Sequence, residues 1–237
     1  MLSLAPPGQH ADPGQSPGGC WTMTMVALEA GSRPTLGPAG GRGKRLLDLV
    51  LILMALPILL GLGAVIALAI RLDGPGPVLF SQIRIGRHGR PFRMIKFRTM
   101  VPEAEALRAA LLAGSDREGL CYKQRHDPRV TRIGRLLRRS SLDELPQIWN
   151  ICRGEMSLVG PRPALPEEVA GYGPRARARL AGLPGLTGLW QISGRADLDF
   201  DQMIELDLAY LARAGMAADL CILWRTLGAV ATGRGAY

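Results

Sequence analysis

Aromatic residues, clustered metal ligands and acidic charge are all scarce in this 237-residue sequence. Phe, Trp and Tyr make up 5% of it. This argues against a binder of single-stranded nucleic acid, because such proteins stack bases on aromatic rings. The four cysteines, Cys20, Cys121, Cys152 and Cys221, are scattered. Their spacing predicts neither a metal site nor a disulfide framework, and we expect reduced thiols in a protein that faces the cytosol.

Acidic residues are also too few to balance the basic ones. The sequence has 29 Lys and Arg against 20 Asp and Glu, for a formal net charge of +9. Such a charge favours anionic partners, which include phosphorylated substrates, acidic lipid headgroups and nucleic acid. Because aromatic residues are few, we expect no nucleic-acid partner.

The first part of the chain differs from the rest in composition. Residues 1–41 are rich in Gly, Pro and Ser and show no apolar period, which predicts a disordered N-terminal tail. A signal peptide is not expected, because no basic segment followed by an apolar core opens the sequence. Residues 46–70 then form an apolar run of ~25 residues, longer than the ~20 that a spanning helix needs.

Two features of the apolar run favour a re-entrant helix over a simple spanning one. Pro57 lies in its middle, followed by Gly61 and Gly63, and proline kinks a helix. Basic residues flank both ends, which draws both ends to the cytoplasmic side. They are Arg42, Lys44 and Arg45 before the run, and Arg71, Arg84, Arg87, Arg90 and Arg93 after it. We therefore predict a re-entrant membrane helix-break-helix over residues 42–72.

The remainder, residues 73–237, is predicted to be a cytoplasmic catalytic domain of the α+β class, mostly helical with a small β element. Short strands are expected at residues 78–80 and 91–97, joined by a glycine-rich turn. Helices are expected at residues 103–113, 129–139, 145–152, 200–214 and 217–230. The helix at 129–139 has apolar residues on one side and arginines on the other, a pattern of a surface helix and equally of an amphipathic helix at a membrane interface.

Asp143 and Glu144 are the first candidates for chemistry. An adjacent acidic pair can supply a nucleophile toward phosphorus and a ligand that holds Mg²⁺ against phosphate oxygens. Helix capping is the alternative, since Ser141 and Glu144 fit a capping box and Asp143 fits an N-cap that places Pro146 in the first helical turn. The two interpretations are compatible, because a carboxylate at a helix N-terminus is expected to stay ionised.

Arg162 lies between Pro161 and Pro163. The two prolines restrict the backbone around it, so its guanidinium is predicted to be held in place for bidentate phosphate binding. An ordinary exposed loop is the alternative.

Lys96, Arg98 and Arg138 are further candidates for phosphate contacts. Lys96 and Arg98 share one face of the second predicted strand, although a solvated basic face would look the same. Arg138 and Arg139 end the amphipathic helix just before the acidic pair, where cations also serve as ordinary C-terminal caps.

Together these residues resemble a known family, the bacterial sugar transferases, and within it the monotopic polyprenyl-phosphate phosphoglycosyl transferases of the short type that initiates exopolysaccharide synthesis. The similarity extends from Lys44 to the C-terminus. The matching motifs are Lys44-Arg-Leu-Leu-Asp48, Gly76-Pro-Val78, Lys96-Phe-Arg-Thr-Met100, Asp127-Pro-Arg-Val-Thr131, Ser141-Leu-Asp-Glu-Leu-Pro-Gln147, Gly154-Glu-Met-Ser-Leu-Val-Gly-Pro-Arg-Pro163, Pro184-Gly-Leu-Thr-Gly-Leu-Trp-Gln-Ile-Ser-Gly-Arg195 and Gly233-Arg-Gly-Ala-Tyr237.

The resemblance implies transfer of a hexose-1-phosphate from a UDP-sugar to undecaprenyl phosphate, with release of UMP, on the cytoplasmic face of the inner membrane. Asp143 would form a covalent phosphosugar intermediate, and Glu144 would bind the cofactor Mg²⁺. The residues on substrate-binding motif positions are Lys96, Arg98, Arg138, Pro161, Arg162, Pro163, Gln191 and Arg195. The implied partners are the UDP-sugar, undecaprenyl phosphate and membrane lipids.

Several alternatives stay open at the level of sequence. A membrane-anchored basic scaffold would explain the charge and the apolar run, and a glycosyltransferase that releases UDP would share the substrate. The sugar is not readable, although galactose and glucose are favoured, and homo-oligomerisation is left open. The chain also departs from the family in one respect, since Leu56 precedes Pro57 where a small hydroxyl residue is common.

Overall fold

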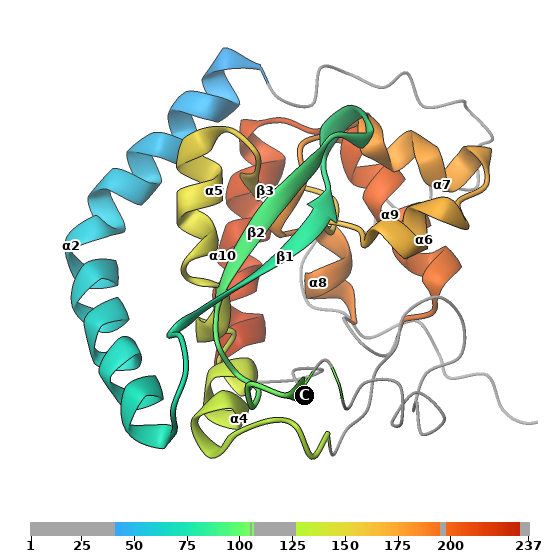
Figure 1. The fold of residues 1–237 in the computed structure, drawn as a ribbon. Coiled ribbons are helices and arrows are strands. Elements are labelled where there is room, and N and C mark those ends of the chain that lie inside the picture. Colours follow the sequence, from blue (N-terminus) through green and yellow to red (C-terminus); the bar gives the residue numbers. More distant parts are fainter. Residues whose placement is uncertain (1–40, 105, 107–126, 195–197, 233–237) are drawn as a thin grey trace, which may run out of the picture. The chain divides into compact units, whose positions relative to one another are not determined.

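The computed structural model describes residues 41–104, 106, 127–194 and 198–232. The predicted tail up to residue 40, most of the predicted helix at 103–113 and the candidate Arg195 lie outside the described residues. The rest has the predicted class, because it is mostly helical with small β elements (Figure 1).

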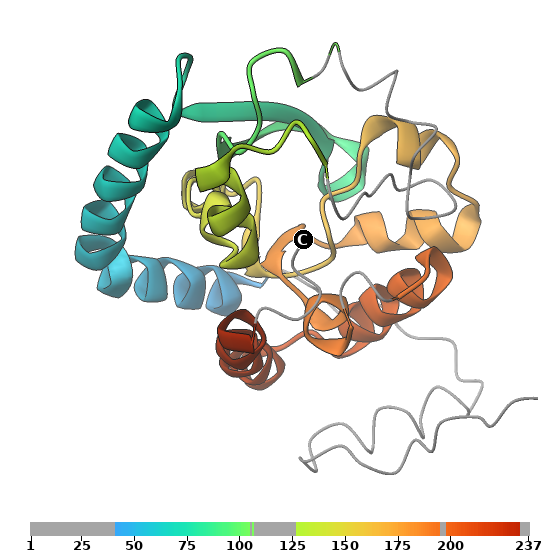
Figure 2. The ribbon, with the colours of Figure 1, turned by 90° about the horizontal axis from the view of Figure 1, so that it is seen from below.

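A long apolar helix, α2 (Arg42–Asp73), opens the described chain. It continues without interruption through Pro57, and Figure 2 shows that it changes direction in its middle part. By length and composition α2 is able to cross a membrane, so the predicted membrane segment is confirmed at that level, and its re-entrant course stays a prediction. The large apolar side chains that it exposes are Leu46, Leu49, Val50, Leu53, Met54, Ile58, Leu60, Val65, Leu68 and Leu72.

The first turns of α2 carry a polar inner side that is fixed to the rest of the domain. Lys44 donates to Asp219 and to the Tyr210 hydroxyl, at 2.5 and 3.1 Å. Asp48 accepts from the Ser157 hydroxyl at 2.7 Å. These side chains are buried, and a buried charge is stable only when it is paired. The start of α2 is therefore bound to the rest of the described chain through specific polar contacts.

An antiparallel hairpin forms the larger β element. It pairs β1 (Leu79–Ile85) with β2 (Pro91–Phe97), connected by the short 3₁₀ turn η1 (Arg87–Gly89). The first strand is longer than predicted and the second agrees with the prediction. Figure 1 shows the hairpin in front of α5, α10 and β3.

A short parallel pair, β3 (Ser157–Val159) with β4 (Gly185–Thr187), was not predicted. Three glycines allow its backbones to approach closely. A Cβ on Gly185 would lie 2.1 Å from the Gly160 nitrogen, and one on Gly188 would lie 2.3 Å from the Gly160 oxygen. No side chain fits at these distances, which explains why glycines recur in these motifs.

Helices complete the domain. After α2 they are α4 (Arg132–Arg139), η3 (Leu142–Glu144), α5 (Gln147–Arg153), α6 (Pro166–Ala170), α7 (Pro174–Ala178), η4 (Arg179–Ala181), α8 (Leu189–Ser193), α9 (Phe200–Arg213) and α10 (Met216–Thr232). The predicted helices at 129–139, 145–152, 200–214 and 217–230 are thus confirmed with small shifts of their ends, whereas α6, α7 and α8 were missed because each is only five residues long.

Two core clusters hold the hairpin in place. Phe92 and Met94 of β2 pack with Ile52 of α2, Ile151 of α5 and Met156. At the other end of α2, a second cluster joins it to the base of β2 and to α4; its buried members are Ile66, Ile70, Phe97 and Leu137. The hairpin is therefore packed against both halves of α2, and the end of β2 lies beside the turn that carries the acidic pair.

Candidate active site

The acidic pair lies in a tight 3₁₀ turn, η3, between α4 and α5. Ser141, just before it, has φ 55°, a left-handed conformation that is uncommon for a residue other than glycine. Both capping interpretations were wrong. The Ser141 side chain makes no cap hydrogen bond, and α5 begins only at Gln147, after Pro146. Asp143 and Glu144 therefore project from a turn whose backbone is locally strained, a feature that often accompanies function.

Lys96 is the cation that joins the two carboxylates. Its Nζ lies 2.6 Å from Glu144 Oε1 and 4.0 Å from Asp143 Oδ2. Asp143 is buried, and this burial raises the pKa of its carboxyl group to about 6, although Lys96 acts in the opposite direction. The expectation that a helix N-terminus keeps Asp143 ionised is thus corrected. A cation and burial act on it, and they act in opposite directions.

Arg138, at the end of α4, supplies a second cation near Asp143. Its charge also lowers the pKa of Asp143, and its Nε donates to the Thr99 hydroxyl at 3.0 Å. For this bond to form, α4 must lie close to the backbone at Thr99. Gly134 permits this, because a Cβ at that position would lie 2.1 Å from the backbone carbonyl oxygen of Thr99. Arg138 thus acts on the charge of Asp143, and its predicted phosphate contact stays a prediction.

Arg98 has different partners. Its guanidinium donates to the carbonyl oxygens of Ile70, Gly74 and Pro75. These are carbonyls at and just beyond the C-terminal end of α2, where backbone acceptors lack helical partners. The structure therefore places Arg98 as a cap of α2, although its sequence motif had suggested a phosphate contact.

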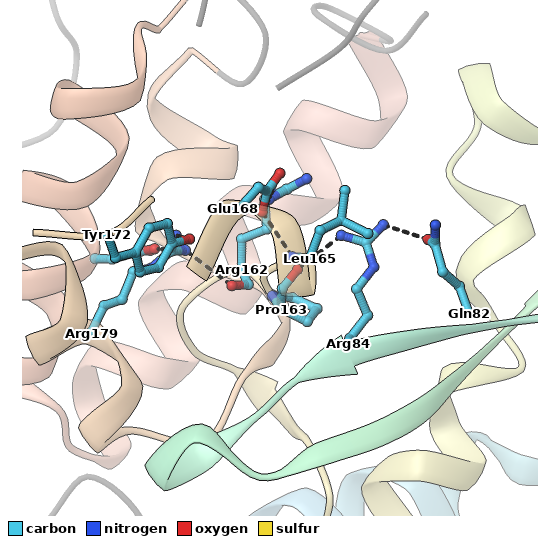
Figure 3. A network of polar contacts seen from close by, with 9 residues as sticks. Gln82, Arg84, Arg162, Pro163, Leu165, Glu168, Tyr172 and Arg179 are labelled. Atoms are coloured by element: carbon cyan, nitrogen blue, oxygen red, sulfur yellow. Dashed lines mark hydrogen bonds and ion pairs between the residues drawn. The ribbon is translucent and has the colours of Figure 1, made fainter. Parts of the chain in front are cut away.

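The Arg162 loop, residues 161–163, forms a second polar group (Figure 3). Arg162 Nη1 donates to both carboxylate oxygens of Glu168, at 3.1 and 2.8 Å. Glu168 is almost completely buried and also accepts from the Leu165 amide. Pro161 and Pro163 are buried on either side. Glu168 thus holds the guanidinium, and the predicted phosphate binding by Arg162 stays a prediction.

Gln191 lies on the side of the molecule that carries this loop. It belongs to α8, and its Nε2 donates to the Leu186 carbonyl of β4 at 3.1 Å. Since β4 pairs with β3, whose end leads into the Arg162 loop, Gln191 supports the strand beside the loop.

The hairpin of β1 and β2 contacts both the acidic pair and the Arg162 loop. Side chains alternate along a strand, so Lys96 and Phe80, which are paired, face the same side as the pair Arg84 and Phe92. Arg84 contacts the Arg162 loop. The step of four residues from Phe80 to Arg84 corresponds to about 14 Å along the strand. The acidic pair and the Arg162 loop are therefore approached from one face of the hairpin, at different points along it.

The fit of Mg²⁺, the cofactor implied by the resemblance, can be judged from the donors present. In the described ranges no cluster of three or more His, Cys, Asp and Glu side chains is found. Mg²⁺ does not require one, because it often takes one or two carboxylates together with substrate phosphates and retains several waters. Asp143 and Glu144 fit that mode.

Several residues in these contacts were not found from the sequence. Thr99 orients Arg138, Glu168 orients Arg162, and Arg84 and Arg179 contact the loop backbone. Glu168 could have been suspected, since it stands three residues after Leu165 in a capping-box position. The other three carry no local signal, because their partners are distant in sequence.

Comparison with known proteins agrees with the geometry. The chain is 39% identical over 220 residues to the exopolysaccharide production protein ExoY of Sinorhizobium fredii, covering 91% of this chain and 96% of that one. It is 38% identical over 201 residues to the undecaprenyl-phosphate galactose phosphotransferase of Salmonella typhimurium, covering 82% and 41%. It is 40% identical over 202 residues to the UDP-glucose:undecaprenyl-phosphate glucose-1-phosphate transferase of Caulobacter vibrioides, covering 82% and 72%.

The chain thus spans less than half the length of some of the curated relatives that it matches. The similarity nevertheless includes the hairpin, the acidic pair and the Arg162 loop, because the model of the family described as bacterial sugar transferase matches residues 40–233. This match covers most of the sequence. The chain therefore belongs to the bacterial sugar transferase family.

Proposed function

We propose that the protein transfers a hexose-1-phosphate from a UDP-sugar to undecaprenyl phosphate through a covalent intermediate on Asp143. The observation that carries this proposal is the buried carboxylate of Asp143 beside Glu144 and Lys96, with Lys96 Nζ 4.0 Å from Asp143 Oδ2. The names of two relatives, a galactose phosphotransferase and a glucose-1-phosphate transferase acting on undecaprenyl phosphate, support the same reaction class.

In the first half-reaction, a carboxylate oxygen of Asp143 attacks the β-phosphorus of the UDP-sugar. A new P–O bond forms to Asp143, the bond from the β-phosphorus to the oxygen bridging the two phosphates breaks, and UMP leaves with that oxygen. Asp143 must be deprotonated to attack. Lys96 and Arg138 favour that state because both lower the pKa that burial raises.

In the second half-reaction, an oxygen of undecaprenyl phosphate attacks the phosphorus held by Asp143. The acyl phosphate P–O bond breaks, and the Asp143 carboxylate is restored. The product is undecaprenyl-diphosphate-sugar, which would initiate a surface polysaccharide. No net proton transfer is needed, which fits a site that offers charges rather than a histidine base.

The charges around Asp143 have separate tasks in this scheme. Phosphoryl transfer depends on neutralising phosphate charge, and Lys96 and Arg138 are the protein cations at the acidic pair. Glu144, with Asp143, would hold Mg²⁺, which when bound neutralises phosphate oxygens as a Lewis acid. Without a metal, Lys96 holds the Glu144 carboxylate at 2.6 Å.

Arg162 would contact the same substrate at a second point, away from the reacting phosphorus. A UDP-sugar is extended, with nucleoside and sugar at opposite ends of a diphosphate. Lys96, which contacts Glu144, and Arg84, which contacts the Arg162 loop, lie about 14 Å apart along one face of the hairpin. Such spacing suits one substrate contacted at two points.

The membrane helix would bring this site to its lipid substrate. The outer side of α2 exposes a band of apolar side chains, and α10 exposes Leu220, Trp224 and Leu227 at helical spacing. A lipid bilayer is the environment in which such surfaces are stable. We place the domain on the cytoplasmic face of the inner membrane, with α2 re-entrant, because basic residues flank both of its ends.

Incubation with Mg²⁺ and a labelled UDP-sugar, in the absence of lipid, tests the reaction. We expect release of UMP and one sugar phosphate attached to Asp143, and loss of both in Asp143→Asn. Asp201→Asn, which changes an exposed acid in α9, serves as the matched control. UMP release only when undecaprenyl phosphate is present, with no adduct, would mean direct attack by the lipid. Release of UDP would mean glycosyl transfer.

The topology needs a separate experiment. Cysteines introduced near Arg33 and near Gly89 should both react only with reagents on the cytoplasmic side. Labelling from opposite sides would establish a spanning helix. Replacing Pro57 with Leu should shift part of the population toward spanning, because a straight apolar helix of this length can cross.

A further inference from the structure

The Arg162 loop has few backbone groups by which it can be held. Pro161 and Pro163 have no backbone N–H, so Arg162 is the only one of the three residues with a donor. Carbonyl oxygens are therefore the main means of fixing the loop. Each of the three carbonyls accepts a hydrogen bond, and each donor comes from a different element. The donors to Pro161, Arg162 and Pro163 are the Gly185 amide at 2.8 Å, Arg179 Nη2 at 3.0 Å and Arg84 Nη1 at 3.1 Å.

Two of these donors are charged and are themselves held in place. Arg179 is 1% exposed; it forms an ion pair with buried Asp207 and donates to the Tyr172 hydroxyl at 3.0 Å. Arg84 Nη2 donates to Gln82 Oε1 at 2.8 Å. Figure 3 shows Arg84 and Arg179 approaching the loop from opposite sides. A guanidinium stays charged and presents several donors in a fixed plane. It can therefore donate to a loop carbonyl and to a second group at the same time.

We propose that Arg84 and Arg179 are positioning residues for Arg162, and that they fix its backbone so that its guanidinium points to the substrate. This inference rests on the proposed function, in which Arg162 contacts the UDP-sugar. The side chain of Arg162 has an anchor of its own in Glu168. Backbone and side chain are thus fixed by separate residues, and a change in Arg84 or Arg179 should act on activity only through Arg162.

Hydrogen exchange tests the positioning without reference to activity. In Arg84→Ala and Arg179→Lys, amides in the segment 157–165 should exchange at least five-fold faster than in the parent. Arg84→Lys, which keeps the charge, provides a milder variant should Arg179→Lys fail to fold. Arg45→Lys is the matched control, because Arg45 also donates to two backbone carbonyls, those of Ile151 and Cys152, away from the loop. Unchanged exchange in all the loop variants would overturn the inference, whatever their activity.

A double-mutant cycle tests whether the effect runs through Arg162. We expect Arg84→Ala to lower kcat/KM for the UDP-sugar about ten-fold, mainly through KM, and Arg45→Lys to leave it within two-fold. In an Arg162→Ala background, Arg84→Ala should have less than a two-fold effect. An equal loss in both backgrounds would show that Arg84 acts independently and would overturn the inference.

The same data separate this inference from the proposed function. If Arg162→Ala alone leaves UMP release unchanged, Arg162 does not contact the substrate, and the proposed role of the loop fails. A faster exchange in the Arg84 variant would then still show that Arg84 fixes the loop, but its claimed consequence for activity would be overturned. If both Arg162→Ala and Arg84→Ala reduce activity without additivity, and exchange rises, both stand.

Discussion

Asp143 and Arg162 both have rigid surroundings, but their charges are treated differently. The turn that carries Asp143 buries a carboxylate next to a second carboxylate, and Lys96 lies at 4.0 Å from the first and 2.6 Å from the second. Burial and the neighbouring Glu144 raise the pKa of Asp143 to about 6, although Lys96 lowers it. The Arg162 loop, by contrast, has a hydrogen bond on each of its three carbonyls and a carboxylate on its guanidinium.

The difference indicates a division between a reactive and a rigid region. Burial makes the ionised carboxylate of Asp143 unfavourable. A bond to phosphorus removes that negative charge from the carboxylate and so relieves the unfavourable free energy. A fully bonded arginine loop cannot react, but it can hold one end of a substrate in a fixed position. Four predictions test this comparison.

The largest effect is expected for Asp143→Asn. It should abolish UMP release, because a neutral amide is not a nucleophile, and it should also stabilise the protein at neutral pH. A carboxyl whose pKa is raised on folding binds more protons in the native state, so its ionisation costs stability as pH rises from about 4 through about 6. The difference between about 6 and the ordinary value of 3.8 corresponds to roughly 3 kcal/mol. Denaturant unfolding at pH 5 and pH 8 would measure the effect, and a destabilised variant at pH 8 would contradict it.

Arg162→Lys is expected to reduce activity by about ten- to a hundred-fold, because an ammonium lacks the planar guanidinium that can contact Glu168 through Nη1 and offer its other N–H groups to a phosphate. Steady-state kinetics with the UDP-sugar would measure this loss. Arg175→Lys is the control, since Arg175 forms an exposed pair with Glu205, where little change is expected. Kinetics of Arg162→Lys within two-fold of the parent would remove Arg162 from the phosphate site.

Lys96→Met should change the pH profile as well as the rate. Lys96 lowers the pKa of Asp143, so its removal should raise that pKa and move the acid limb of the UMP-release profile to higher pH. At pH 7 the rate should fall by about ten-fold, since a smaller fraction of Asp143 is ionised and a cation is lost. Arg90→Met, at an exposed position in the hairpin turn, is the control. An unshifted acid limb would show that Lys96 does not act on Asp143.

The smallest effects concern Ser141, which has φ 55° before the acidic pair. Glycine accepts this conformation, so Ser141→Gly should change the free energy of unfolding by less than about 1 kcal/mol. Valine accepts it poorly, and Ser141→Val should cost about 1–2 kcal/mol. Thermal unfolding of the two variants, with Ser140→Gly and Ser140→Val as a matched pair, would measure the contrast. Equal melting temperatures for both Ser141 variants would argue that the turn is free to relax.

Much of this protein was readable from its sequence because the signals are local. The apolar run of α2, the alternation in β2, the helices at either end of the domain and the order of the motifs need only neighbouring residues to be recognised. The acidic pair and the arginine between two prolines were likewise identified as candidates, because adjacent carboxylates and a restricted arginine imply chemistry by themselves.

Only the tertiary structure decided which charged residues meet. Lys96 and Arg98 look equivalent on one strand, yet Lys96 reaches Glu144 and Arg98 caps α2. Arg84 and Arg179 carry no motif signal, yet both contact the Arg162 loop. The physical reason is that a hydrogen bond or an ion pair acts over a few ångströms, whereas its partners here are separated by 17 to 79 residues. Local sequence patterns determine the helices and strands, and the packing of these elements determines which charged side chains interact.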